Sequence, residues 1–165
     1  YPLRRQRQMC IRDRYYIHFN EKYEGVAAWH KELGNEAIRF NKITNKSGRQ
    51  YAFPDVKRNA RGGVSHFTMI KNYPVQGFAT GDVVPVVLIE MEERMKHLKS
   101  CLVNTVHDSS VADVHPEEKD EVLQIIEDMN DNLTNLIEKS YGVKMNVPLL
   151  LESKIGPNWL DVQDV

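Results

Sequence analysis

The densest group of chemically capable side chains lies in the string NTVHDSSVADVH, which gathers His107, Asp108, Asp113 and His115. A carboxylate at a tight turn is well placed to hold a hard divalent cation, because Mg²⁺ takes one or two carboxylates and keeps its other positions for water and phosphate oxygens. Asp108 can instead bond its own turn backbone, and His115, which precedes a proline, can be a helix-entry residue. No spacing here matches a recurrent zinc pattern, so we do not expect a zinc site.

A second group lies in KNYPVQG, where Asn72 and Gln76 stand four residues apart at the expected start of a helix. Side chains at that spacing lie on one helix face, so both amides could reach one ligand. The alternative is that Asn72 caps the helix and that Gln76 is merely exposed.

Basic residues gather in two places. The polar, glycine-rich string DVKRNARGGVSH carries Lys57, Arg58 and Arg61 and predicts an exposed loop. The string RRQRQMCIRDR near the N-terminus could bind phosphates or form a solvated tail. However, a run of codons that translates to this string residue for residue resembles a transposase-based sequencing adapter. We therefore interpret residues 1–14 as an artefact, expect them to be disordered, and place the start of the native chain near Tyr15.

The elements that must position these residues follow from periodicity and turn residues. Helical spacing runs over residues 15–40, weakened near YEGV, and Ser47-Gly48 supplies a turn between strands that contain Ile43 and Tyr51. An apolar segment, residues 78–99, predicts a buried helix kinked at Pro85.

The second half of the chain predicts a hairpin, a helix and a strand. Residues 101–115 are rich in β-branched residues around HDSS, which favours an antiparallel hairpin with His107 and Asp108 near its tip. An amphipathic helix should run from Pro116 to Gly142. VPLLLES then predicts a buried strand. The segment that contains Trp159 predicts a C-terminal tail that covers part of the protein surface. Helices mixed with antiparallel strands predict an α+β fold.

Bulk composition limits the class of protein. The chain has 165 residues, the size of one ordinary domain, and a net charge of −1. Its longest apolar run is far shorter than the roughly 20 residues of a membrane helix. With residues 1–14 set aside, Cys101 is the single cysteine and cannot form an internal disulfide, which fits a reducing compartment. We expect a cytoplasmic protein with no membrane partner.

Several segments in order resemble successive landmarks of family A DNA polymerases, the DNA polymerase I type, particularly phage and viral members. They are FNEKYEGVAAW, SGRQYAFPDVK, NYPVQGFATGDVV, VHDSSVADVHPEE, VPLLLES and IGPNW. The resemblance implies a polymerase fragment: distal fingers helices and a hairpin in residues 15–71, and part of the palm in residues 72–165. In this palm portion an antiparallel sheet with a catalytic hairpin, residues 101–115, would pack with long helices.

The resemblance also implies roles. Asp108 would be a catalytic metal ligand, His107 would contact the primer end, and Asn72 and Gln76 would face the minor groove of template-primer DNA. Lys57, Arg58 and Arg61 are the further DNA-binding candidates. The implied reaction is deoxynucleotidyl transfer from deoxynucleoside triphosphates to a primer 3′-hydroxyl with two Mg²⁺ ions.

Two departures and one gap qualify the resemblance. Ser109 stands where family members commonly have Glu, and Gly81 where Ala is usual, at a cost of about 1 kcal/mol inside a helix. The second set of metal ligands and the helix that grips the nucleotide would lie before Tyr15, so we expect the fragment alone to be inactive. If it is a phage enzyme, the compartment would be the bacterial host cytoplasm.

Two alternatives remain open. One is a metal-dependent phosphohydrolase that uses His107, Asp108 and His115. The other is a non-catalytic module that binds duplex DNA with a salt-dependent affinity.

Overall fold

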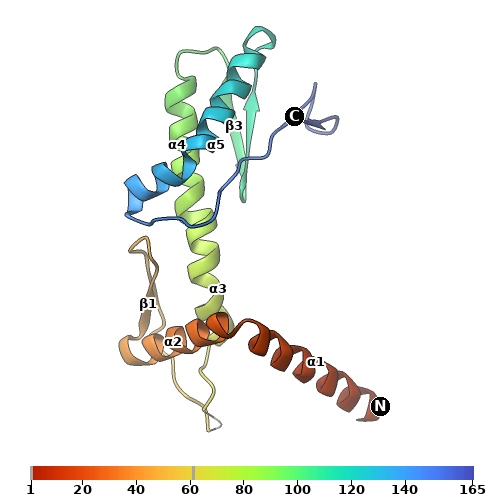
Figure 1. Ribbon diagram of the computed structural model, residues 1–165, viewed down its shortest axis with the longest axis vertical. Helices are drawn as coiled ribbons and strands as arrows, with labels where there is room; N and C mark the ends of the chain where they lie inside the picture. Colours follow the sequence, from red (N-terminus) through yellow and green to blue (C-terminus); the bar gives the residue numbers. More distant parts are fainter. Residues whose placement is uncertain (1, 61) are drawn as a thin grey trace. The chain divides into compact units, whose positions relative to one another are not determined.

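The computed structural model describes residues 2–60 and 62–165, with side chains for residue 11 and for residues 13–60 and 62–165. It divides into two compact units, one made of Tyr1–Thr44 and Gln50–Pro74 and the other of Asn45–Arg49 and Val75–Val165. Within the described residues, long helices accompany three two-stranded antiparallel sheets (Figure 1). The predicted α+β class is confirmed.

The first unit contains two helices, a short hairpin and the start of a third helix. Its elements are α1 (Pro2–Lys22), α2 (Glu24–Phe40), β1 (Lys42–Thr44), β2 (Gln50–Ala52) and the first part of α3 (Phe67–Phe78). The break between α1 and α2 falls at Tyr23, whose backbone is non-helical, as the weakened pattern near YEGV predicts. The core is formed by buried residues from α2, β1 and α3 and by the residue that follows β2: Leu33, Ala37, Ile43, Phe53 and Ile70.

Residues 2–14 differ from the expectation of a disordered segment, because their backbone continues the helix α1. No side chain of α1 that the structure describes is buried. A helix of 21 residues is long enough to form several turns by local hydrogen bonding alone. The helical backbone therefore does not require packing against a core, and the origin of this segment stays a prediction.

The β1–β2 hairpin forms around the predicted turn, and its register places Ile43 opposite Tyr51. Ile43 is fully buried while Lys42 and Thr44 are exposed, the alternation expected of a strand with one buried face. Gly48 has a φ of 87°, a backbone conformation that glycine adopts without steric cost. The turn residues 45–49 belong to the second unit.

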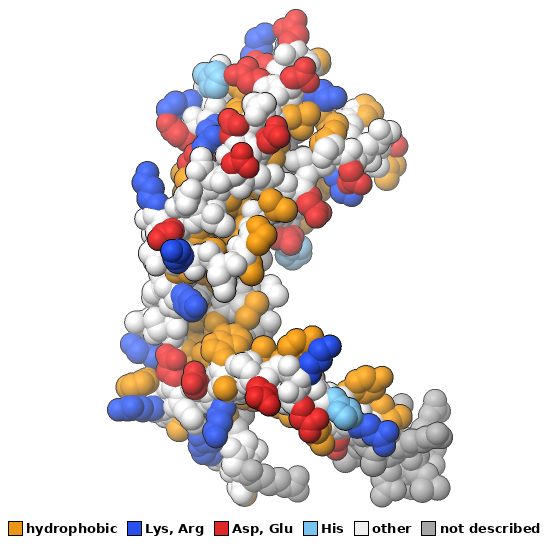
Figure 2. Space-filling view, viewed as in Figure 1, with side chains coloured by type: hydrophobic (Ala, Val, Ile, Leu, Met, Phe, Trp, Pro, Cys, Tyr) orange, Lys and Arg blue, Asp and Glu red, His pale blue; other side chains and the backbone are white. Residues whose placement is uncertain are grey.

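The second unit is built on two helices and a long hairpin. After the end of α3 come a π-helical turn η1 (Ala79–Val83), α4 (Val84–Met95), β3 (Cys101–Val106), β4 (Ser109–Asp113), η2 (Pro116–Glu118), α5 (Lys119–Tyr141), β5 (Lys154–Ile155) and β6 (Gln163–Asp164). Its core joins one face of α4 to one face of α5: Val87, Met91, Met95, Val122, Met129 and Leu133. Figure 2 shows acidic and basic side chains mixed where α4 ends and α5 begins.

The helix expected over residues 78–99 differs from the structure in its bounds and in its irregularity. The helical segment begins at Phe67, passes through η1 and ends at Met95. Pro85 has no N–H, so the carbonyl of Gly81, four residues earlier, loses its helical donor and would clash with the proline ring. The chain adopts a π-turn there, in which the Val84 N–H donates to Ala79 O.

The β3–β4 hairpin and the helix after it agree with the prediction. Figure 1 shows the hairpin beside α4 and α5, and its residues Leu102, Ala112 and Val114 pack on their core. The register shifts between Leu102 and Asn104 at a bulge. Helix α5 ends at Tyr141, and the following Gly142 has a φ of 67° and donates its N–H to Glu138 O, a common helix termination.

The strand predicted for residues 147–153 is wrong, because no β-ladder forms there within the described part of the chain. The backbone of Leu151 pairs with the Asn130 amide instead: its N–H donates to Oδ1 at 2.6 Å and its carbonyl accepts from Nδ2 at 3.1 Å. These contacts satisfy the extended backbone without a neighbouring strand. The tail forms the β5–β6 hairpin, and Trp159 is 64% exposed rather than closed over a surface.

Among the helices that the structure describes, none is both long and apolar enough to cross a membrane.

Candidate catalytic hairpin and DNA-facing residues

His107 and Asp108 form the two-residue loop between β3 and β4, as predicted. They join the paired residues Val106 and Ser109. His107 has a φ of 56° whereas the φ of Asp108 is not positive, which is the sign pattern of a type II′ turn. Glycine is preferred at that first position, and a left-handed backbone costs another residue roughly 1–2 kcal/mol. The ladder on both sides therefore holds His107 in a conformation it would not choose alone.

The Asp108 side chain is presented to solvent. Both Asp108 and His107 are exposed, and the Asp108 carboxylate makes no hydrogen bond to the turn backbone or to any other described residue. The turn is instead closed by the Ser109 hydroxyl, which donates to Val106 O at 2.9 Å. The alternative in which Asp108 serves only as a turn residue bonding its own backbone is therefore not what the structure adopts.

The other two members of the predicted cluster lie away from this tip. Asp113 pairs with Cys101 at the open end of the hairpin. His115 precedes η2, where its Nδ1 accepts from the Glu117 N–H at 3.4 Å, so the helix-entry interpretation is confirmed. Over residues 2–60 and 62–165, no three His, Cys, Asp or Glu side chains come together in a way that could hold a metal ion. The geometry therefore gives no support to a hydrolase site built from His107, Asp108 and His115.

Sequence reasoning missed the carboxylate that closes the open end of the hairpin. Glu118 Oε2 accepts from the backbone N–H of Lys99 at 3.0 Å, the backbone N–H of Ser100 at 2.9 Å and the Ser100 hydroxyl at 2.7 Å. These bonds, that from Lys99 most of all, lower the pKa of Glu118 to about 2. The only sequence feature pointing to it is an acidic residue in a first helical turn, which is common.

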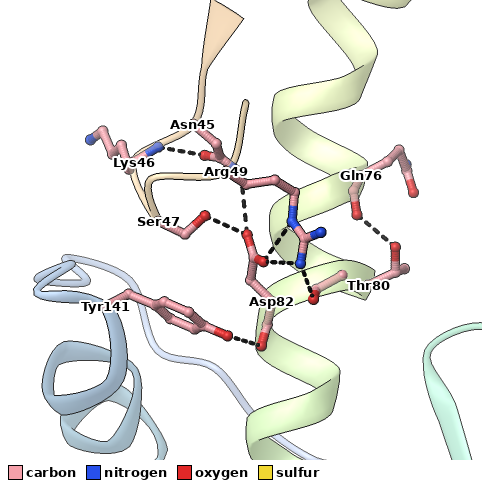
Figure 3. Close-up of polar contacts among 9 residues, drawn as sticks. Asn45, Lys46, Ser47, Arg49, Gln76, Thr80, Asp82 and Tyr141 are labelled. Atoms are coloured by element: carbon pink, nitrogen blue, oxygen red, sulfur yellow. Dashed lines mark hydrogen bonds and ion pairs between the residues drawn. The ribbon is translucent and has the colours of Figure 1, made fainter. Parts of the chain in front are cut away.

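A second missed group surrounds the buried carboxylate of Asp82, in η1 (Figure 3). Arg49 donates to Asp82 Oδ1 from Nε at 2.9 Å and from Nη2 at 2.7 Å, and the Ser47 hydroxyl donates to Oδ2 at 2.5 Å. The Asp82 side chain is only 3% exposed, against 48% for that of Arg49. A buried charge requires such a partner because desolvation is costly.

Side chains also satisfy the backbone of the π-turn. Arg49 Nη2 donates to Gly81 O at 2.8 Å, which is the carbonyl that Pro85 leaves without a helical donor. The Tyr141 hydroxyl donates to Asp82 O at 3.0 Å. The turn residues 45–49, η1 and the end of α5 are therefore joined by one polar network (Figure 3). No sequence pattern pointed to it, since its members are far apart along the chain.

Asn72 and Gln76 both lie on α3, four residues apart, and both are exposed. Because α3 begins at Phe67, Asn72 lies inside the helix, and the interpretation of Asn72 as a cap is wrong. Neither side-chain amide bonds to another described residue; the Thr80 hydroxyl donates to the backbone carbonyl of Gln76 at 2.7 Å. Each amide therefore presents free donors to solvent.

The predicted basic loop is exposed, but some of its polar groups form hydrogen bonds within the chain. Lys57 is exposed, and its backbone pairs with Ser65. The Arg58 guanidinium donates to Asn35 Oδ1 at 2.5 Å and to Gly62 O at 3.1 Å. Arg61 lies outside the described residues.

The same loop borders a cavity of about 400 Å³ in the first unit, which is also lined by His30. Partial burial and the nearby Lys71 charge lower the pKa of His30, because both disfavour its protonated form.

The structure thus defines an α+β protein in which a β-turn presents a carboxylate and an imidazole, and in which the helix α3 carries two exposed amides. Residues 11–161 match the family described as DNA polymerase family A, and the chain belongs to that family.

Curated relatives agree with this assignment. The chain is 32% identical over 152 residues to the DNA polymerase I of Caldicellulosiruptor bescii and 27% identical over 148 residues to that of Bacillus subtilis, covering 87% of this chain and 16% of each relative. It is 26% identical over 145 residues to a DNA polymerase of Bacillus phage SP01, covering 86% of this chain and 15% of the relative. The chain therefore spans about one sixth of the length of these relatives.

Proposed function

We propose that this chain is a palm and distal-fingers segment of a template-directed DNA polymerase. In the proposed reaction the primer 3′-hydroxyl loses its proton and attacks the α-phosphorus of a deoxynucleoside triphosphate, and pyrophosphate leaves. The observation that carries the proposal is the family match over residues 11–161, which includes the hairpin that presents Asp108 at its tip. Template-primer DNA and deoxynucleoside triphosphates are the proposed partners.

The Asp108 carboxylate is suited to serve as one ligand of a Mg²⁺ ion. It is exposed and forms no hydrogen bond to the described residues, and Mg²⁺ needs only one or two protein carboxylates. When bound, Mg²⁺ would stabilise negative charge on the attacking and leaving oxygens. Ser109 has a hydroxyl in place of a second carboxylate, and this hydroxyl closes the turn. We therefore infer that the second ligand set lies outside this chain and that the chain alone does not extend primers.

The exposed amides suit contacts that are common to all base pairs. In the minor groove A·T and T·A both present only acceptors, and G·C keeps the same acceptors. Asn72 and Gln76 can each donate to them through a side-chain NH₂. His107 would contact the last primer pair, and Lys57, Arg58 and Arg61 would contribute phosphate contacts.

The test places residues 11–161 into the Caldicellulosiruptor bescii polymerase in place of its matching segment. Asp108→Asn should abolish primer extension and leave duplex binding unchanged, because it removes a metal-ligand charge without a contact to DNA. Asp113→Asn is the matched control: it makes the same charge change at the other end of the same hairpin. Ser109→Ala should have a far smaller effect.

Extension at an undiminished rate in Asp108→Asn, or an equal loss in Asp113→Asn, would overturn the proposal. The 165-residue chain gives a second measurement, independent of the chimera. It should bind primer-template duplex with an affinity that falls as salt rises, without extending the primer. Incorporation by the pure chain that depends on Asp108 would show that the ligand set is complete within it.

A further inference from the structure

The open end of the β3–β4 hairpin is fastened to the start of α5 by the carboxylate of Glu118. We propose that Glu118 is a positioning residue that holds this open end and thereby sets where Asp108 and His107 lie at the tip. The inference rests on the proposed function, since it concerns the same catalytic hairpin. In this role Glu118 acts through the hairpin, by its bonds to Lys99 and Ser100.

The Glu118 carboxylate is linked to residues that flank both strands of the hairpin. Ser100, whose side chain and backbone both donate to Glu118, immediately precedes β3. The Ser100 hydroxyl also accepts from the backbone N–H of His115, two residues after β4, at 2.9 Å. Ser100 is 4% exposed, so water competes little for these bonds. One buried hydroxyl therefore ties the two ends of the hairpin to each other and to Glu118.

A carboxylate suits this position because every group that forms a hydrogen bond with it is a donor. The donors are two backbone N–H groups and one hydroxyl, and hydrogen bonds to an ionised acceptor are shorter and stronger than neutral ones. A glutamine would keep one oxygen but would turn an NH₂ toward donors. Glu118→Gln should therefore keep the shape of the side chain and weaken the attachment, because it loses the charge and turns an NH₂ toward the Lys99 N–H.

The hairpin beyond its open end has few contacts that could fix its orientation relative to α4 and α5. All residues of β3 except Leu102 are exposed, and an isolated two-stranded hairpin is marginally stable. The contacts to the core of α4 and α5 come from Leu102, Ala112 and Val114, which lie near the open end. The tip that carries Asp108 therefore extends from a base held by these apolar contacts and by Glu118.

The length of the hairpin amplifies a small movement at its base. The six residues of β3 span about 20 Å at roughly 3.3 Å per residue. A tilt of about 3° at the base moves such a tip by about 1 Å, and a misplacement of about 1 Å can cost ~100-fold in catalytic rate. Removing Glu118 can therefore lower the rate strongly while the hairpin ladder stays intact.

The first experiment measures the direction of the hairpin in the 165-residue chain. Residual dipolar couplings of the backbone amides of Val106 and Ser109 are compared with those of α5 in the wild type and in Glu118→Ala and Glu118→Gln. We expect the hairpin couplings to be averaged in both variants while those of α5 are unchanged. Glu117→Gln is the matched control, because Glu117 is 81% exposed and its nearest charged partners lie at 3.9–4.0 Å. Unchanged hairpin couplings in both Glu118 variants would overturn the proposal.

The second experiment measures extension by the chimeric polymerase. In Glu118→Ala we expect kcat to fall ~10- to 100-fold, with the KM for nucleotide and the Kd for duplex within about 2-fold of wild type. Glu118→Gln should lie between Glu118→Ala and the wild type, and Glu117→Gln should match the wild type. An unchanged kcat, or a loss of duplex binding equal to the loss of rate, would overturn the positioning role. The proposed function would still be tested separately, by primer extension in Asp108→Asn.

Discussion

Ser109 and His107 together decide how the Asp108 carboxylate is presented. The Ser109 hydroxyl donates to Val106 O and closes the turn, so Asp108 does not need to bond the backbone itself. His107 takes the positive φ of the loop, which leaves Asp108 in an ordinary backbone region. An Asp in a turn often bonds the turn backbone with its own side chain. Here the neighbouring residues stabilise the turn, and the Asp108 carboxylate remains available as a ligand.

At the residue scale, we expect the stabilisation that the Glu118 carboxylate provides to depend on pH. Its folded pKa is lowered from 4.5 to about 2, so the stabilisation is fully present above pH 4.5 and is lost as the pH falls from there toward pH 2. The groups that face it are the N–H of Lys99, Ser100 and the His115 ring, and a protonated His115 favours the ionised carboxylate.

Amide exchange at Ser100 and Cys101 should therefore accelerate as the pH falls from 4.5 to 2, beyond the intrinsic pH dependence of exchange. Glu118→Gln removes the titrating group and should show no such extra change, whereas Glu117→Gln should behave as the wild type. The same extra acceleration in Glu118→Gln would show that another group is responsible.

At the scale of elements, the π-turn η1 is stabilised by residues that do not belong to its helix. Pro85 removes the helical donor to Gly81 O, and Arg49 replaces it while also pairing with Asp82. The two partners of this ion pair are unequal, because Asp82 is buried whereas half of the Arg49 side chain is exposed. An uncompensated charge is costly only where water cannot reach it.

Arg49→Ala should therefore destabilise the second unit more than Asp82→Asn does. Arg49→Ala leaves a buried carboxylate without its cation, at a cost of about 3 kcal/mol. Asp82→Asn leaves a guanidinium that water can solvate, at a cost of about 1–3 kcal/mol. Denaturant unfolding of the 165-residue variants measures both. Equal losses, or a larger loss in Asp82→Asn, would contradict this view of the pair.

The elements that the sequence could predict are those specified by local patterns. The helix break at Tyr23, the turn at Gly48 and the hairpin tip at His107-Asp108 follow from periodicity and turn residues. The apolar run that contains Leu151 was misassigned, because an apolar run favours a strand only if a neighbouring strand exists, and here the Asn130 amide pairs with its backbone. Glu118 and Asp82 escaped prediction because their partners are distant in sequence.

At the scale of the whole molecule, the described residues of the helix α1 contribute nothing to the core of the first unit. Every core residue of the first unit lies in α2, in the β1–β2 hairpin region or in α3. At the junction between α1 and α2, the Phe19 and Tyr23 rings lie 4.9 Å apart and the Tyr23 N–H donates to Phe19 O. Residues 1–14 precede all of these contacts.

Deletion of residues 1–14 should therefore leave stability unchanged. No described side chain in that segment is buried, and exposed positions usually change the free energy of unfolding by less than ~0.5 kcal/mol. Helical content by circular dichroism should fall, because the segment is helical, while the denaturant midpoint and the duplex affinity of the chain stay the same. Deletion of residues 1–22 is the control: it also removes the Phe19 contacts and should lower the midpoint. A loss of more than ~1 kcal/mol on removing residues 1–14 alone would show that this segment belongs to the native fold.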